Sequence, residues 1–205
     1  SGDLGTGLPD LERSKLGAGI TAVATLATFL SRRGDPIGLE IMGGQGCTYR
    51  SIPARQRSLA PIMRTLAEIK PDGEANLAGA FARIGARLPR RSVVILVSDL
   101  MEEPSHWGPA VHALCQRGVD VRVLHLYDPS EWNIDFDDAL RLYSPEGGED
   151  LALDPVVARE QMKQVISGYV SEVKSALALG RATHFLHPAG EGLDSAMRAI
   201  LRGRA

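Results

Sequence analysis

The spacing of apolar residues in the first quarter of the chain predicts a helix followed by a β-hairpin. Residues 14–33 carry apolar side chains at helical spacing with little charge among them, so we expect a helix that is covered on more than one side. Residues 37–42 alternate apolar and polar positions, and residues 47–52 run back after the glycine-rich turn at 43–46. This pattern is typical of two antiparallel strands.

The middle of the chain predicts a parallel strand pair. Helices are expected over residues 59–69 and 77–88, followed by a continuous apolar run at 93–98. Such a run is typical of a strand that is buried on both faces of a parallel sheet. Ser105 is expected to cap the next helix, and 119–126 is the next strand, which gives a right-handed strand-helix-strand unit.

The last third of the chain predicts a small hairpin, a long helix, a strand and a closing helix. The hairpin is expected as a flap at about 139–153, and the long helix begins at Asp154-Pro155. We therefore predict one α/β domain over residues 1–205, with helices on both faces of a mostly parallel sheet. That sheet is expected to contain 37–42, 93–98, 119–126 and 183–187, with 47–52 antiparallel at an edge.

Composition and charge exclude several classes of protein. Of 205 residues, 44% are hydrophobic, and the net charge is -2, which argues against a protein that mainly binds nucleic acid. Cys47 and Cys115 are too few and too far apart for a disulfide framework or a zinc site, so a reducing, cytoplasmic location is favoured. The apolar stretch at 17–30 is shorter than the about 20 residues that span a bilayer. A membrane tether through an N-terminal segment outside this chain is left open.

Candidate chemistry is expected where the parallel strands end, because ligands of open α/β sheets bind beyond the carboxyl ends of the strands. Asp99 directly follows the buried strand, so it is the strongest candidate for a metal ligand or a phosphoacceptor. The same position often holds a helix cap or a turn aspartate. Glu102 and Glu103 are interpreted mainly as solvated charges of the next helix. The other positions at these strand ends are Gly43, Ser98, Tyr127 and Asp128.

Common catalytic motifs are missing from the sequence. The glycines at 43–46 precede a strand and lack a following Lys-Ser or Lys-Thr, so they predict a hairpin turn and not a nucleotide loop. The five histidines form no His-Glu-x-x-His pair, and the spacing of His184 and His187 places them on opposite faces of a strand. There is no Gly-x-Ser-x-Gly elbow, so no hydrolase nucleophile is predicted.

Several phrases of the sequence, in order, resemble the domain of unknown function 58 (DUF58) family, a bacterial branch of von Willebrand factor A-like proteins. The resemblance covers nearly the whole chain and implies a three-layer, Rossmann-like sheet with helices on both faces. The phrases are Ser14-Lys15-Leu16, Arg33 to Leu39, Lys70 to Glu74, Val97 to Leu100, His125 to Pro129 and Leu153 to Pro155.

The resemblance also implies a metal-ion-dependent adhesion site at the carboxyl edge of the sheet. That site takes an Asp-x-Ser-x-Ser loop after the first, central strand, a Thr before a later helix, and an Asp that Asp99 matches; together they bind Mg²⁺. Ala75 stands at the Thr position, and Asn76 beside it is the nearby oxygen donor. We expect the first strand and its loop to be absent from this chain. The metal site is therefore expected to be degenerate, with Mg²⁺ bound only if an N-terminal loop completes it.

The function implied by the resemblance is that of a binding module and not of an enzyme. The expected partner is a protein, of the MoxR-type AAA+ ATPase class, and the expected contact surface comprises Asp99, Glu102 and Glu103 with the flap. An alternative is an enzyme that uses Asp99 as a metal ligand or phosphoacceptor. A third reading is a purely structural relative.

A missing first strand would leave a gap between residues 37–42 and 93–98. Each buried backbone group without a partner costs about 1–3 kcal/mol, so a row of them is too costly for a marginally stable domain. We expect the gap to be filled by an N-terminal segment or by a strand from another chain, which would make an oligomer.

Overall fold

The computed structural model describes residues 14–42, 50–55, 58–69, 76–132, 140–142, 151–153 and 155–203. Several parts of the sequence analysis lie outside the described residues, among them the glycine turn at 43–46, positions 47–49 of the strand expected at 47–52, Ala75, the turn of the flap and Asp154. The expectation about a first strand concerns residues before Ser14, which also lie outside them.

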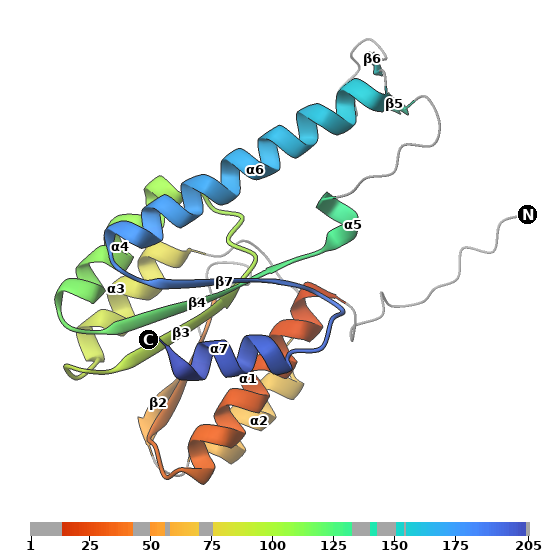
Figure 1. The fold of residues 1–205 in the computed structure, drawn as a ribbon. Coiled ribbons are helices and arrows are strands. Elements are labelled where there is room, and N and C mark those ends of the chain that lie inside the picture. Colours follow the sequence, from red (N-terminus) through yellow and green to blue (C-terminus); the bar gives the residue numbers. More distant parts are fainter. Residues whose placement is uncertain are drawn as a thin grey trace, which may run out of the picture.

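A parallel sheet of three strands forms the centre of the fold (Figure 1). Its strands are β3 (Val93–Ser98), β4 (Asp120–Tyr127) and β7 (Thr183–Pro188), in the order β3-β4-β7. Val97 lies beside Leu124, and Leu124 lies beside Phe185, so the carboxyl ends of the strands meet at one edge. The prediction of a parallel α/β sheet is confirmed.

Helices cover both faces of this sheet, as predicted. On one face, side chains such as Val123 pack against α3 (Leu77–Arg87), α4 (Pro104–Gln116) and α6 (Pro155–Leu179). On the other face, side chains such as Leu124 pack against α1 (Lys15–Arg32) and α7 (Asp194–Arg202). Successive side chains of a strand point to opposite faces, so the apolar runs of β3 and β4 serve both layers.

The hairpin near the N-terminus is not part of the parallel sheet within the described residues. β1 (Ile37–Ile41) pairs only with β2 (Arg50–Arg55), in an antiparallel sheet of two strands, so the predicted place of 37–42 in the parallel sheet is wrong there. The hairpin has its own core, in which Ile37 packs with Ile62 of α2 (Leu59–Ala67) and with α1. Alternating apolar positions predict a strand with one buried face, but they do not specify its neighbour.

The edge of β3 that faces away from β4 has no strand beside it among the described residues. Leu96 is buried, but Val93 is 50% exposed and the other β3 side chains are half-buried. The prediction that both faces are covered therefore holds, while full burial of the strand does not. β1 and β3 do not pair in this part of the chain, so the expected filling of the gap stays a prediction.

Two short strands precede the long helix α6. β5 (Leu140–Leu142) and β6 (Leu151–Leu153) pair antiparallel in the range where the flap was expected, and α6 extends well past the sheet (Figure 1). None of the helices in the described ranges combines the length and the apolar character that crossing a membrane requires.

The helix after β3 begins two residues earlier than predicted. Pro104 occupies its first turn and Glu103 is the N-cap residue, without a capping hydrogen bond from its side chain, so the prediction of Ser105 as the cap is wrong. Proline is favoured at the first position of a helix because its φ is already helical and its missing N–H would be unpaired there anyway. Ser105 instead lies exposed in the first turn of the helix.

Candidate functional site

The loop after β3 turns sharply at the carboxyl edge of the sheet. Leu100 has a φ of 52°, and its N–H donates to Ser98 Oγ at 3.0 Å. A left-handed conformation is unusual for a leucine and persists where the surroundings compensate its strain. Here the turn buries the Leu100 side chain completely and leaves Met101 74% exposed, with Asp99 at the edge of the sheet.

Asp99 forms an ion pair with Lys15. Lys15 Nζ lies 3.3 Å from Asp99 Oδ2 and 2.8 Å from Glu131 Oε2. Burial acts to lower the pKa of Lys15, but the hydrogen bond to Glu131 and the charge of Asp99 outweigh it, so this pKa is raised. The ammonium therefore joins three elements, because Lys15 begins α1, Asp99 follows β3, and Glu131 lies in the short helix α5 (Pro129–Trp132).

Asn76 and Glu102 both bind backbone N–H groups at the start of α3. Asn76 Oδ1 accepts from Gly79 N–H at 2.7 Å, and Glu102 Oε1 accepts from Leu77 N–H at 2.7 Å. A carboxylate is favourable there because the first N–H groups of a helix lack partners within the helix. Asn76 thus caps its own helix, and Glu102 attaches the β3–α4 loop to α3.

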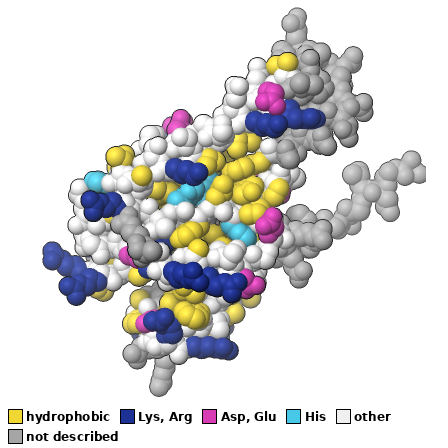
Figure 2. Space-filling view, in the orientation of Figure 1, with side chains coloured by type: hydrophobic (Ala, Val, Ile, Leu, Met, Phe, Trp, Pro, Cys, Tyr) yellow, Lys and Arg dark blue, Asp and Glu magenta, His cyan; other side chains and the backbone are white. Residues whose placement is uncertain are grey.

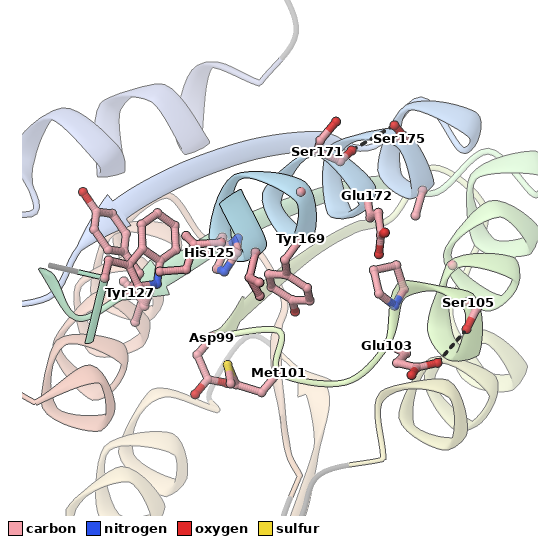
Figure 3. A pocket seen from close by; sticks show the side chains of 18 of the residues that line it. Asp99, Met101, Glu103, Ser105, His125, Tyr127, Tyr169, Ser171, Glu172 and Ser175 are labelled. Carbon is pink, nitrogen blue, oxygen red and sulfur yellow. Dashed lines mark hydrogen bonds between the residues drawn. The ribbon is translucent and has the colours of Figure 1, made fainter. Parts of the chain in front are cut away.

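Glu103 faces solvent at the start of α4. Its carboxylate lies 3.4 Å from Ser105 Oγ and 3.8 Å from His106 Nε2, and its side chain is 77% exposed. Figure 3 shows Asp99, Met101 and Glu103 following one another along the edge of the pocket. Of the three predicted contact residues, Glu103 is therefore the most accessible to a partner.

The residues that follow β4 form a compact turn. Asp128 Oδ1 accepts hydrogen bonds from the N–H and the hydroxyl of Ser130, at 2.8 and 2.7 Å, and these bonds lower the pKa of Asp128. Tyr127 stacks on Trp132 with ring centroids 4.0 Å apart. Asp128 therefore stabilises the turn that starts α5. The stacked rings of Tyr127 and Trp132 form an aromatic wall of the site.

The buried His125 pairs with the half-buried His184 beside this aromatic wall. His125 Nδ1 lies 3.1 Å from His184 Nε2, and the rings of Trp132 and Tyr169 present their edges to His125 with centroids 6.4 Å away. Burial, helped by the neighbouring His184, lowers the pKa of His125 to about 4. Burial lowers the pKa of His184 as well. The two imidazoles are therefore held neutral near pH 7.

A large pocket opens beside these residues, between α4, α6 and the carboxyl ends of β3 and β4. Its volume is about 1480 Å³, and its lining is mostly apolar. Glu172 of α6 reaches toward the loop that carries Glu103 (Figure 3). The titratable side chains of the lining are Lys15, Asp99, Glu103, His112, His125, Tyr127, Glu131, Tyr169 and Glu172.

Sequence reasoning found one end of this site and missed the other. It placed Asp99, Glu102 and Glu103 at the carboxyl edge, where they lie, but it did not identify Lys15 or Glu131 as partners of Asp99. The phrase Ser14-Lys15-Leu16 was noted only for its resemblance. The sequence does not show that the start of this helix lies next to the end of this strand. The pairing of Lys15 with Asp99 could therefore be predicted only once the spatial arrangement of the elements is known.

Comparison with known proteins identifies the family. The profile of the family described as protein of unknown function DUF58 matches residues 6–172. The chain belongs to the DUF58 family. None of the curated proteins matches it.

Solved structures share the fold of this DUF58 chain at low sequence identity. The conserved hypothetical protein BatB from Bacteroides thetaiotaomicron has a TM-score of 0.58 and 18% identity, over 95% of this chain and 88% of that one. An aerotolerance-related membrane protein from Bacteroides fragilis NCTC 9343, with multiple mutations to serines, has a TM-score of 0.54 and 16% identity, over 94% of both chains. These similarities establish a common fold.

The described side chains of this DUF58 domain do not fit a divalent metal site at Asp99. The Asp99 carboxylate faces the Lys15 ammonium, and Asn76 Oδ1 already accepts a hydrogen bond within its own helix cap. Within the described ranges, no three or more His, Cys, Asp or Glu side chains converge as metal ligands. Mg²⁺ requires several oxygen ligands in near-octahedral order. The Lys15 ammonium beside Asp99 also repels the cation, so both features oppose its binding.

Calorimetric titration of the chain with Mg²⁺ and with Mn²⁺ is expected to show no saturable binding at low micromolar concentrations. The physical reason is that Lys15 already neutralises Asp99 and that Ala75 offers no side-chain oxygen. Asp99→Ala serves as the control and is expected to give the same trace. Saturable binding in the unmodified chain that Asp99→Ala abolishes would contradict this reading of the site.

Proposed function

We propose that this DUF58 domain is a protein-interaction module that binds its partner at the carboxyl edge of the parallel sheet. The observation that carries the proposal is the exposed Met101, which together with Glu103 lines a pocket of about 1480 Å³. Exposed apolar side chains next to an apolar hollow are typical of contact surfaces. Glu102 supports this surface by attaching the loop to Leu77 of α3.

The resemblance to von Willebrand factor A-like domains supports the same edge as the contact surface. It also supports a MoxR-type AAA+ ATPase as the partner and a cytoplasmic location for the contact. In our proposal the contact is made without a divalent ion, since the Lys15 ammonium supplies the positive charge that faces Asp99.

The alternative function is that of an enzyme that uses Asp99 as a metal ligand or a phosphoacceptor. Such chemistry requires further carboxylates or other polar ligands directed at the same point. Among the described residues, Glu131 is the carboxylate linked to Asp99, and the link runs through Lys15. The binding module is therefore the better-supported function.

Binding of a MoxR-type AAA+ ATPase to the immobilised chain, measured by biolayer interferometry, tests the proposal. Met101→Asp is expected to weaken binding at least tenfold, about 1.4 kcal/mol, because it places a charge in an apolar contact. The matched control is Val93→Asp. Val93 is 50% exposed and Met101 is 74% exposed, but Val93 lies at the opposite, amino end of β3.

The two variants separate the outcomes. Unchanged affinity for Val93→Asp together with the loss for Met101→Asp supports the carboxyl edge as the contact surface. Equal affinity of Met101→Asp and the unmodified chain would contradict it. Addition of EDTA is expected to leave the affinity unchanged, and a large loss with EDTA would contradict the proposed metal-free contact.

A further inference from the structure

The long helix α6 carries both buried and exposed apolar side chains. Val173 and Leu177 are fully buried against the sheet and α4, whereas Met162 is 37% exposed and Val165 is 67% exposed. The helix extends beyond the sheet in Figure 1, and hydrophobic side chains gather between α6 and the sheet in Figure 2. Contiguous exposed apolar surface of this kind marks an interaction site.

The large pocket continues this exposed surface as a groove between α4 and α6. Its volume of about 1480 Å³ exceeds the about 300–1,000 Å³ of most small-molecule sites, so it fits a segment of polypeptide better than a metabolite. Methionine side chains at its wall are flexible and adapt to a bound surface. The apolar wall includes Met101, Pro104, Pro109, Met162, Val165 and Leu179.

The charge of the groove is negative. Its lining contains Asp99, Glu103, Glu131 and Glu172, while Lys15 is already bound to Asp99 and Glu131. Glu103 and Glu172 therefore form an acidic rim beside the apolar wall. Such a rim repels fatty acids and anionic phospholipids and attracts lysine or arginine side chains.

Charge also argues against occupation of the groove by residues 133–139, which follow Trp132 of its lining in the sequence. That segment carries Asp135, Asp137 and Asp138, which an acidic rim would repel. A basic segment of another protein complements the rim better.

We propose that the groove between α4 and α6 binds an amphipathic helix of a partner protein, with apolar side chains on one face and lysine or arginine residues beside them. A helix laid into an apolar groove between two helices is a common mode of recognition. This inference rests on the proposed function and names the chemistry of the partner segment. The apolar face would contact Val165 and Met162, and the basic residues would meet Glu103 and Glu172.

A pair of designed peptides tests this chemistry on the full chain. The first is an amphipathic peptide of leucine and lysine of about 15 residues, a length at which an isolated helix becomes stable, and the second has glutamate in place of each lysine. Fluorescence anisotropy with labelled peptides is expected to show at least tenfold tighter binding of the lysine peptide. Its affinity is expected to fall as salt is raised, because exposed charges are screened.

Matched variants of α6 locate the binding site. Val165→Lys is expected to weaken binding of the lysine peptide at least tenfold, since it removes an apolar contact and adds a like charge. Val157→Lys changes a similarly exposed valine on the same helix that does not line the groove, and it is expected to leave affinity unchanged. Glu172→Gln is expected to weaken the lysine peptide about threefold, and the control Glu191→Gln, outside the groove, is expected to have no effect.

Each contrary result overturns a defined part of the inference. If the two peptides bind with equal affinity and Val165→Lys weakens both, the partner segment need not be basic. That result would refute the basic partner but retain the groove as a protein-binding surface. Insensitivity to Val165→Lys would refute the groove itself. A dimer that Val165→Lys dissociates, or binding of a fluorescent fatty acid in place of the peptides, would show a different occupant. The proposed function fails separately, through the Met101→Asp result with the ATPase.

Discussion

Replacing Trp107 with alanine is expected to lower the free energy of unfolding by about 4 kcal/mol, because it removes the largest fully buried side chain of the described core. Trp107 lies in α4 and packs in the cluster that joins α3, α4 and α6 to the sheet. Its Nε1 also donates a hydrogen bond to the Glu102 carbonyl at 3.0 Å. The substitution therefore weakens both the core and the β3–α4 loop.

Urea denaturation followed by fluorescence and circular dichroism measures this loss. Trp107→Phe keeps most of the ring volume but leaves the Glu102 carbonyl without its donor, so a smaller loss of about 1–2 kcal/mol is expected. Trp132→Phe is the matched control, since Trp132 is only half-buried on α5, and a loss under about 1 kcal/mol is expected. A Trp107→Ala chain as stable as the control would contradict the described packing of α4.

Lowering the pH from about 6.5 to about 4 is expected to destabilise the fold through His125. The ordinary pKa of 6.5 applies to the unfolded chain, whereas burial lowers the pKa in the folded domain to about 4. Above pH 6.5 the imidazole is neutral in both states, so it does not affect stability. Between the two values the unfolded chain takes up a proton and the folded chain does not, so the free energy of unfolding falls.

The expected loss across this window is on the order of 2 kcal/mol. His184, whose pKa is also lowered, contributes in the same direction, and the Lys15 ammonium also disfavours protonation of His125. Asp99 acts in the opposite direction, because it favours the charged imidazole. Desolvation is the largest of these effects and sets the sign.

Urea denaturation at several pH values, with the unmodified chain and His125→Phe, checks this expectation. The variant cannot be protonated at this position, so its stability is expected to fall less between pH 6.5 and 4. His106→Phe is the control, since His106 is exposed on α4, and it is expected to keep the pH dependence of the unmodified chain. The same pH dependence in His125→Phe and the unmodified chain would contradict the burial of a neutral His125.

Most of the helices and strands of this DUF58 domain could be predicted from the sequence. The apolar run at 93–98 became β3, and the apolar periodicity around Val173 and Leu177 became the buried face of α6. These signals are local, because the period of apolar positions differs between a helix and a strand. The predicted Ser105 cap was wrong because Pro104 competes for the first turn of the helix, which capping preference alone does not weigh.

The position of Asp99 at the carboxyl edge followed from the sequence, but its ionic partner did not. Lys15 and Glu131 are 116 positions apart in the chain, and they meet because α1 packs under the sheet while α5 follows β4. His125 and His184 likewise come together only because β4 and β7 are neighbours in the sheet. Spacing along the chain contains no information about such pairs until the strand order is known.

The sequence by itself determined which segments are helices and strands, which side chains are apolar enough for the core, and which acidic residues follow β3. Only the tertiary structure decided that β1 pairs with β2 apart from the parallel sheet, that Lys15 neutralises Asp99, and that α4 and α6 enclose an apolar groove. The physical reason is that periodicity and turn chemistry act between near neighbours in the chain. Strand order, ion pairs and grooves depend on which distant surfaces bury each other best.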